Sequence, residues 1–184
     1  MKTISITLFI LLAAFFTNVS AQDESSGENY GGTLNLGLGL GYYGYVGHSM
    51  PVIHADYEFS VANNFTLAPF ISFYSYRSKY FYINHDNYYY YHETVIPIGV
   101  KGSYYFDDLF QAGQKWDFYA AGSLGFAFST NRWDDGYDGD VDVYHSANPL
   151  FLNLHIGAEY HFNNRIGAFL DLSTGVSTIG ISIH

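Results

Sequence analysis

Apolar and polar residues alternate with a period of two along most of the chain. The longest example runs from Leu150 to Phe162, where every second residue is apolar while asparagine, histidine, glycine and glutamate fill most of the gaps. The segments from Leu34 to Leu40 and from Ile53 to Val61 show the same alternation. Successive side chains of a β-strand point to opposite faces, so the pattern predicts strands with one apolar face each. We find no comparable helical stretch.

Extended along the chain, this pattern predicts eight strands. Their expected bounds are 33–44, 51–62, 65–77, 92–106, 117–129, 149–162, 165–174 and 177–184. Asn63-Asn64 and Asn163-Asn164 are typical of two-residue hairpin turns that tolerate positive φ, whereas residues 78–91 and 130–148 are expected to form long polar and aromatic loops. The long loops fall at one end, although the connection from Asp107 to Trp116, at the other end, is longer than a tight turn. The prediction is an all-β, eight-stranded, antiparallel, up-and-down barrel.

The composition of the polar face indicates which side of the sheet faces outward. It holds mainly glycine, alanine, serine and asparagine, which suits the crowded lumen of a small barrel better than a surface facing water. The apolar face then lies outside, and the barrel is transmembrane. The alternative is a soluble secreted β-protein with an aromatic core.

Aromatic residues gather where the expected strands end, as two girdles at the membrane interfaces would. Near the long loops they are Tyr42, Tyr43, Tyr45, Tyr74, Tyr76, Tyr80 and Tyr88 to Tyr91, and near the short turns Phe59, Phe65, Tyr104, Phe106, Trp116, Phe118, Tyr160 and Phe162.

The N-terminus has the features of an export signal. Lys2 precedes an apolar stretch from Ile4 to Phe16, and Val19-Ser20-Ala21 offers small residues to signal peptidase. A retained membrane anchor is the alternative, but the stretch is shorter than the roughly 20 residues that a spanning helix needs. We expect a signal peptide over 1–21, a flexible periplasmic lead-in over 22–32 and the barrel domain over 33–184.

Composition excludes several other classes of protein. The chain has 17 acidic and 7 basic residues, a formal charge of -10, 20% aromatic residues and no cysteine. A nucleic-acid binder would need a basic surface, a disordered chain would lack the aromatic content, and disulfide or cysteine-ligated zinc scaffolds need sulfur.

The expected mature chain resembles the small outer-membrane β-barrel proteins of Gram-negative bacteria, the OmpA/OmpW-like superfamily, and especially the eight-stranded members found in Bacteroidota. The resemblance rests on the Ala21-Gln22 junction, the Asn-Asn turns, the stretch from Ile96 to Lys101 and the closing stretch from Gly175 to His184. It implies an integral protein of the outer membrane, with the barrel assembly machinery as a partner during biogenesis and membrane lipid and lipopolysaccharide as its surroundings. Such barrels usually end in an aromatic residue, whose place His184 takes here.

Ionisable residues on the polar face should meet in one narrow lumen. They are His54, Asp56, Glu58, Lys101, His155, Glu159, His161 and Asp171, with the polar Asn153 among them. Charges inside a barrel must pair or hydrogen-bond, so we expect a network that plugs the lumen, with Lys101 as the main counter-charge. A narrow channel for ions or small solutes is the alternative, although an eight-stranded barrel has an interior just large enough for its own side chains.

An acidic segment invites a comparison with calcium sites. Its aspartates are Asp134, Asp135, Asp138, Asp140 and Asp142. The spacing is not that of an EF-hand, because Val143 replaces the glycine and no glutamate closes the loop. A solvated acidic loop is favoured over a specific metal site, and loose Ca²⁺ binding is the alternative. We expect no other cofactor.

The second expected loop is rich in tyrosine, which offers broad contact area with a hydrogen-bonding tip. It contains Tyr88, Tyr89, Tyr90, Tyr91 and His92, and it favours surface recognition. Ser78, His85, Asp86, His145 and Ser146 leave a lipid-modifying enzyme as an alternative, but no G-x-S-x-G motif is present. We therefore expect a non-enzymatic barrel with a structural or recognition role.

Overall fold

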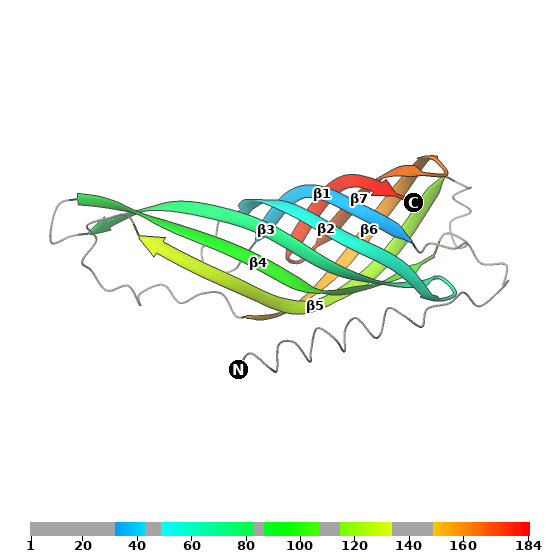
Figure 1. The fold of residues 1–184 in the computed structure, drawn as a ribbon, viewed down its shortest axis with the longest axis horizontal. Coiled ribbons are helices and arrows are strands. Elements are labelled where there is room, and N and C mark those ends of the chain that lie inside the picture. Colours follow the sequence, from blue (N-terminus) through cyan, green and yellow to red (C-terminus); the bar gives the residue numbers. More distant parts are fainter. Residues whose placement is uncertain (1–31, 43–48, 83–86, 107–114, 134–148) are drawn as a thin grey trace, which may run out of the picture.

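The fold is a closed β-barrel (Figure 1). The computed structural model describes residues 32–42, 49–82, 87–106, 115–133 and 149–184. The strands are β1 (Thr33–Tyr42), β2 (Ser49–Ala62), β3 (Phe65–Tyr82), β4 (Asn87–Tyr105), β5 (Trp116–Trp133), β6 (Leu150–Asn163), β7 (Ile166–Ser173) and β8 (Val176–Ile183). Each pairs antiparallel with the next, and β8 pairs with β1. The predicted eight-stranded, antiparallel, up-and-down barrel is confirmed. Among the described residues no helix is long and apolar enough to cross a membrane.

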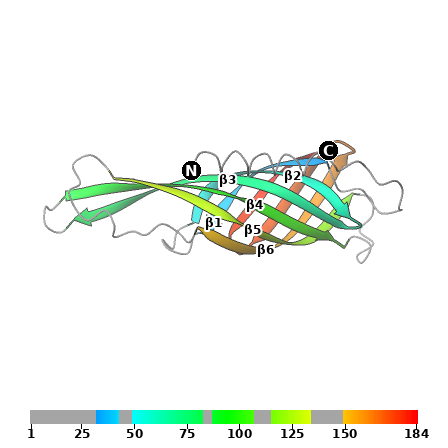
Figure 2. The ribbon, with the colours of Figure 1, turned by 60° about the horizontal axis from the view of Figure 1, so that its bottom comes forward.

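Strands β3, β4 and β5 extend well beyond the bounds that the sequence pattern indicated, and β2 begins two residues early, at Ser49 instead of 51. β3 and β4 stay paired as far as Tyr82 and Asn87, so the prediction of a loop is wrong for 78–82 and for 87–91. Residues 83–86 lie outside the described residues. β2 pairs with β3 only as far as Tyr74, and β6 pairs with β5 only as far as Phe126. The ends of β3, β4 and β5 therefore project beyond the closed barrel, at the left of Figures 1 and 2. We call residues 75–82, 87–94 and 128–133 the β3–β4–β5 extension.

The two predicted tight turns differ in detail. The turn at Asn63 and Asn64 lies where expected, and Asn64 has a φ of 58°. The second turn lies one residue later than predicted, at Asn164 and Arg165. There Asn163 ends β6, and its Oδ1 accepts hydrogen bonds from the backbone N–H groups of Arg165 (2.8 Å) and Ile166 (3.1 Å). That side-chain cap stabilises the displaced turn.

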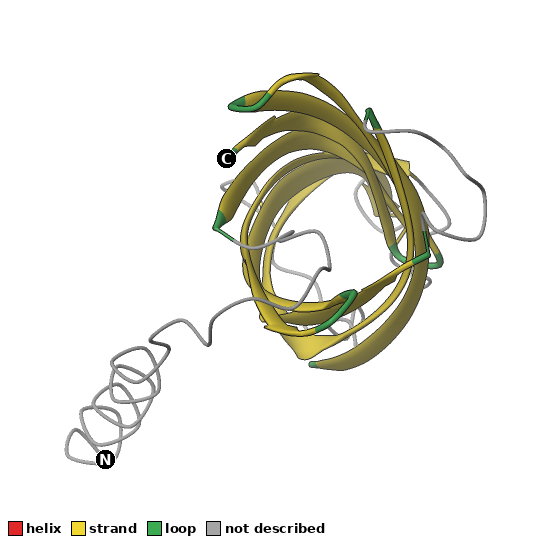
Figure 3. Cartoon of the chain, turned by 90° about the vertical axis from the view of Figure 1, so that its right-hand side faces the viewer, coloured by secondary structure: helices red, strands yellow, loops and turns green. Residues whose placement is uncertain are grey.

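The apolar face of the sheet points outward. Among the described residues, 27 large hydrophobic side chains from all eight strands are exposed, including Leu152 (72%) and Leu154 (65%). Figure 3, a view along the barrel, shows the strands curving around a common axis. The inward faces of the strands carry the buried polar residues. The soluble alternative would need the opposite orientation, with the apolar face inside.

An apolar cluster fills the interior toward the β3–β4–β5 extension. It consists of Val52, Tyr74, Val95 and Ala127, with Phe151 and Val176 packed against it. Tyr74, expected in an outward aromatic girdle, is buried inside the barrel. Tyr74 lies two residues after Ser72 in β3, so both side chains point to the inward face. The prediction of a girdle rested on the position of Tyr74 near the strand end and not on the face to which it points. The inward face is therefore apolar at this end and polar toward the tight turns.

A glycine pair makes room for two of the interior rings. Gly99 and Gly125 face each other across β4 and β5, and a Cβ on either would collide with the backbone opposite it. The same Cβ atoms would also lie 2.9 Å from the Phe70 ring and 2.8 Å from the Phe151 ring. Glycine at both positions lets these rings, 6.0 Å apart between centroids, fill the middle of the lumen.

Candidate functional site

Lys101 lies at the centre of the polar half of the lumen. Its Nζ is 3.4 Å from Asp56 Oδ2 and 3.6 Å from Asp171 Oδ2, so one cation from β4 links carboxylates from β2 and β7. Lys101 is 5% exposed, and both aspartates are also buried. The Tyr119 ring, with its centroid 5.5 Å from Nζ, covers the ammonium group. The cation thus holds opposite walls of the barrel together.

Each of these aspartates also accepts a hydrogen bond from a histidine that contacts a serine. His54 Nε2 is 3.0 Å from Asp56 Oδ2, and its Nδ1 is 2.7 Å from Ser72 Oγ. On the other side of Lys101 lies a similar chain through His155. Its Nδ1 is 2.7 Å from Asp171 Oδ1, and its Nε2 is 2.8 Å from Ser123 Oγ.

Neutral side chains also donate hydrogen bonds to the carboxylates of Asp56, Asp171 and Glu58. Asn35 donates to Asp56 (2.9 Å) and Tyr119 donates to Asp171 (2.8 Å). Glu58 accepts bonds from the hydroxyls of Tyr105 (2.6 Å) and Thr66, and a longer one from Asn35 (3.4 Å). Among the described residues the lumen holds five buried carboxyl groups, of Asp56, Glu58, Asp117, Glu159 and Asp171, and one buried lysine, so hydrogen bonds rather than an equal number of lysine or arginine side chains stabilise this interior.

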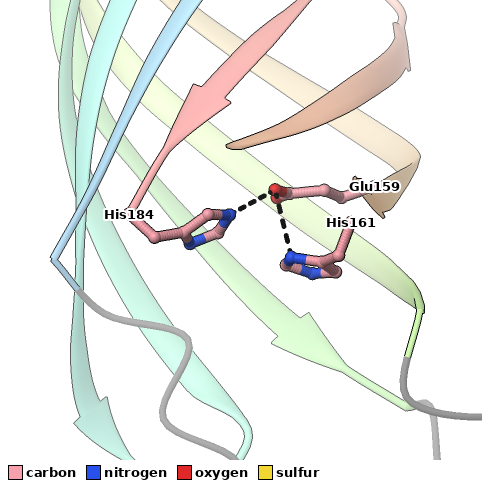
Figure 4. Close-up of side chains that lie close together, drawn as sticks. All are labelled: Glu159, His161 and His184. Carbon is pink, nitrogen blue, oxygen red and sulfur yellow. Dashed lines mark hydrogen bonds and ion pairs between the residues drawn. The ribbon is translucent and has the colours of Figure 1, made fainter. Parts of the chain in front are cut away.

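A second cluster lies at the tight-turn end of the lumen, at the C-terminus (Figure 4). His184 Nε2 is 2.8 Å from Glu159 Oε1, and His161 Nδ1 is 4.0 Å from the same oxygen. His161 Nε2 is 2.7 Å from Asp117 Oδ2, and His184 Nδ1 is 2.9 Å from Thr33 Oγ1. We call Glu159, His161 and His184, with these two partners, the C-terminal cluster.

All eight ionisable residues assigned to the lumen from the sequence lie on the inward face, in two groups. The first group is the network around Lys101, which contains His54, Asp56, Lys101, His155 and Asp171. Glu58 adjoins this network, because Asn35 donates hydrogen bonds to both Glu58 and Asp56. The second group, Glu159 and His161, belongs to the C-terminal cluster. Lys101 forms its ion pairs with the two aspartates, and Glu159 is instead bound by histidine. Asn153 also faces inward, and a Cβ at Gly175 would touch its amide.

Several contributors escaped the sequence prediction. They are Thr33, Asn35, Thr66, Ser72, Tyr105, Asp117, Tyr119, Ser123 and His184. Period two alone could have found Asp117 and Tyr119, which share the inward parity of Ser123 in β5. Tyr105 was hidden between two residues assigned to the outer girdle, Tyr104 and Phe106.

The other predicted sites are not part of these clusters. The five aspartates from 134 to 142 lie outside the described residues, as do His85, Asp86, His145 and Ser146. Tyr88 to Tyr91 and His92 form part of strand β4 rather than a loop. In that strand the Tyr90 ring lies under the Arg77 guanidinium group, 3.8 Å from its carbon to the ring centroid.

The chain of Ser123, His155 and Asp171 has the connectivity of a hydrolytic triad, since Nδ1 faces the carboxylate and Nε2 the hydroxyl. Its surroundings do not suit a nucleophile. Ser123 is only 2% exposed, and Asp171 is also held by Lys101 and Tyr119. A substrate would need access to the serine and donors for an oxyanion, so the arrangement supports a structural hydrogen-bonded chain.

No family model and no curated protein sequence matches the chain. Among solved structures it is similar to Neisserial surface protein A, NspA, with a TM-score of 0.51 and 12% identity over 82% of this chain and 94% of that one. It also matches a structure from the de novo design of transmembrane β-barrels (TM-score 0.44, 16% identity, 85% and 98% covered). A third match is Ail, the attachment invasion locus protein of Yersinia pestis (TM-score 0.37, 10% identity, 82% and 94% covered). At these identities the similarity to NspA concerns the closed-barrel fold alone.

Proposed function

We propose that this chain is an integral outer-membrane barrel that its own side chains seal, with a structural or recognition role at the cell surface. The observation that carries the proposal is the inverted distribution of polarity, with exposed apolar residues on all eight strands around an interior of buried charges. Water disfavours an apolar surface that runs around a whole molecule, whereas a bilayer stabilises it.

The exterior near the tight turns suits a membrane interface. Trp116 stacks on Phe118 with centroids 6.0 Å apart, and Tyr160 lies 4.9 Å from Trp116. Tyr160 also contacts Phe162 edge-on, at 5.4 Å. Aromatic side chains outside the barrel at one end favour the headgroup region of a bilayer.

Recognition is the role that we assign to the opposite end. The β3–β4–β5 extension rises beyond the barrel and ends in tyrosine-rich sequence, and NspA, which shares the fold, is named a surface protein. We further propose membership of the OmpA/OmpW-like barrels of Bacteroidota, with export by the segment 1–21, assembly by the barrel machinery and contact with lipopolysaccharide. No catalytic role and no resident cofactor form part of this proposal, and loose Ca²⁺ binding by Asp134 to Asp142 stays a prediction.

Fractionation and conductance test location and sealing together. The full chain should be recovered with outer-membrane vesicles, resist carbonate extraction and migrate faster in unheated than in heated gel samples. In planar bilayers the purified barrel should give no steady conductance. Recovery in the soluble fraction would contradict the membrane proposal. Steady channels in protein preparations, absent from mock preparations, would support the narrow-channel alternative instead.

A further inference from the structure

The C-terminal cluster has the composition and arrangement of a metal site, and we propose that it binds one divalent transition-metal ion, with Zn²⁺ as the reference ion. Glu159, His161 and His184 each offer one ligand atom within 4.8 Å of the other two (Figure 4). We assign these atoms as a carboxylate oxygen of Glu159, Nδ1 of His161 and Nε2 of His184, since these two nitrogens face Glu159 Oε1. Two imidazoles and one carboxylate are a common ligand set for such ions.

The spacing of the ligand atoms suits one ion with small side-chain rotations. Zinc bonds of about 2.0 to 2.1 Å in a tetrahedron place ligand atoms roughly 3.4 Å apart. The 2.8 Å separation of Glu159 from His184 is shorter than this, and the 4.0 Å separation of Glu159 from His161 is longer. Rotation of the Glu159 carboxylate toward His161 would bring both separations closer to the required value.

The partners of the two histidines orient the nitrogen atoms that would bind metal. His161 Nε2 donates to Asp117 Oδ2 at 2.7 Å, so in the neutral ring Nδ1 presents its lone pair toward Glu159. His184 Nδ1 is 2.9 Å from Thr33 Oγ1, which can accept a hydrogen bond from the Nδ1–H group when Nε2 binds a metal. A histidine held by a carboxylate on its second nitrogen is a recurrent arrangement at metal centres.

The position also allows an ion to enter. The side chains of His161 and His184 are 21% and 23% exposed, whereas Glu159 is 7% exposed. Metal could thus reach the imidazoles from solvent at the tight-turn end, and a water molecule could complete the coordination. The ion would join β6 to the C-terminal residue after β8.

The test is a metal titration of the full barrel, purified without an affinity tag and stripped with EDTA. Equilibrium dialysis with elemental analysis should find one Zn²⁺ per chain, and Co²⁺ should give visible absorption bands. Ca²⁺ and Mg²⁺ at the same concentration should not compete. His161→Ala, His184→Ala and Glu159→Gln should each lower the zinc affinity at least tenfold, and Asp117→Asn by about 10- to 100-fold.

Two further variants keep the test decisive if a ligand variant fails to fold. Gly167→Ala keeps all three ligand residues but puts a methyl group against Glu159 Oε1, which must move away, so this variant should also lower zinc affinity. Joint replacement of His48, His85 and His145, which lie outside the described residues, by alanine is the control and should leave binding unchanged. The proposal is overturned if the wild type binds no stoichiometric zinc, if any folded variant of the three ligands keeps wild-type affinity, or if the control abolishes binding.

Discussion

At the scale of single residues, the interior depends on hydroxyl, amide and imidazole donors that reach carboxylates on other strands. Glu58 on β2, for example, is bound by Thr66 on β3 and Tyr105 on β4. Removing one donor leaves a buried carboxylate partly unsatisfied, which costs more than the same change at an exposed site.

Tyr105 and its neighbour Tyr104 provide a matched comparison of this effect. Tyr105→Phe should lower the free energy of unfolding by about 1.5 to 3 kcal/mol because it removes a hydrogen bond to a carboxylate. Tyr104→Phe deletes the same hydroxyl from an outward side chain that is 52% exposed, and it should cost much less. Urea unfolding in detergent or lipid vesicles measures both. Equal losses would contradict the role assigned to the Tyr105 hydroxyl.

Lys101→Met tests whether the lumen is sealed. In a sealed barrel Asp56 and Asp171 lose their shared cation, so unfolding should become easier by about 3 kcal/mol. Lys115→Met makes the same change at an exposed residue and should be nearly neutral. In a hydrated channel, water would screen the two carboxylates. A Lys101→Met barrel as stable as the wild type, with steady cation-selective current, would therefore refute the sealed lumen.

Alternation in the sequence could place these residues inside but could not pair them. Parity alone gives the inward direction of Asp56, Lys101 and Asp171. Whether these side chains contact one another depends on the stagger between neighbouring strands, and this stagger cannot be inferred from the sequence of any single strand. For the same reason the sequence could not distinguish Glu159, which is bound by the C-terminal His184, from the carboxylates that meet Lys101.

At the scale of elements, the first tight turn depends on one backbone conformation. Asn64 has a φ of 58°, a region that asparagine tolerates and most residues avoid. Asn64→Ala should destabilise the barrel by about 1 kcal/mol. Asn164, in the other turn, is not among the described residues with positive φ, so Asn164→Ala should change stability by less than about 0.5 kcal/mol. Thermal unfolding of the two variants distinguishes the turns, and a larger effect at 164 would contradict the special role assigned to Asn64.

Strand β6 allows a test of which face contacts lipid. Leu154 points outward and is 65% exposed, whereas the adjacent Asn153 points inward. Leu154→Arg should cost about 2 to 4 kcal/mol near the bilayer midplane, and Asn153→Ser should be far milder. Refolding yields and urea midpoints in lipid vesicles provide the measurement. If the serine variant were the worse of the two, the assignment of lipid to the outer face would be wrong.

The sequence pattern predicted the elements of the closed barrel better than the β3–β4–β5 extension. Within the barrel each strand has one face toward the lumen and one toward the exterior, so polar and apolar residues alternate along it. Beyond the barrel no lumen divides one face from the other, so tyrosines follow one another from Tyr88 to Tyr91 without alternation. Those residues nevertheless favour extended backbone and pair with β3, which explains why a segment interpreted as a loop is a strand.

At the scale of the whole molecule, the proposed membrane location would put the two ends of the barrel on opposite sides of the bilayer. If the chain enters from the periplasm, the tight turns stay there and the β3–β4–β5 extension lies outside the cell. The absence of native cysteine makes this testable with single introduced thiols. In intact cells an impermeant maleimide should label Arg132→Cys but not Asn164→Cys, and outer-membrane permeabilisation should expose the second. The reverse labelling would invert the topology.

The seam between β1 and β8 also has a consequence for folding kinetics. It joins Thr33 to His184, which are 151 positions apart, whereas the paired ends of β3 and β4 meet across a short hairpin. Bringing such distant segments together restricts the chain before the seam contacts can form, so closure should follow hairpin formation. Lys101 cannot bridge β2 and β7 until the sheet has curled. The interior network and the seam should therefore form in the same late, cooperative event, and mutations in either should slow folding together.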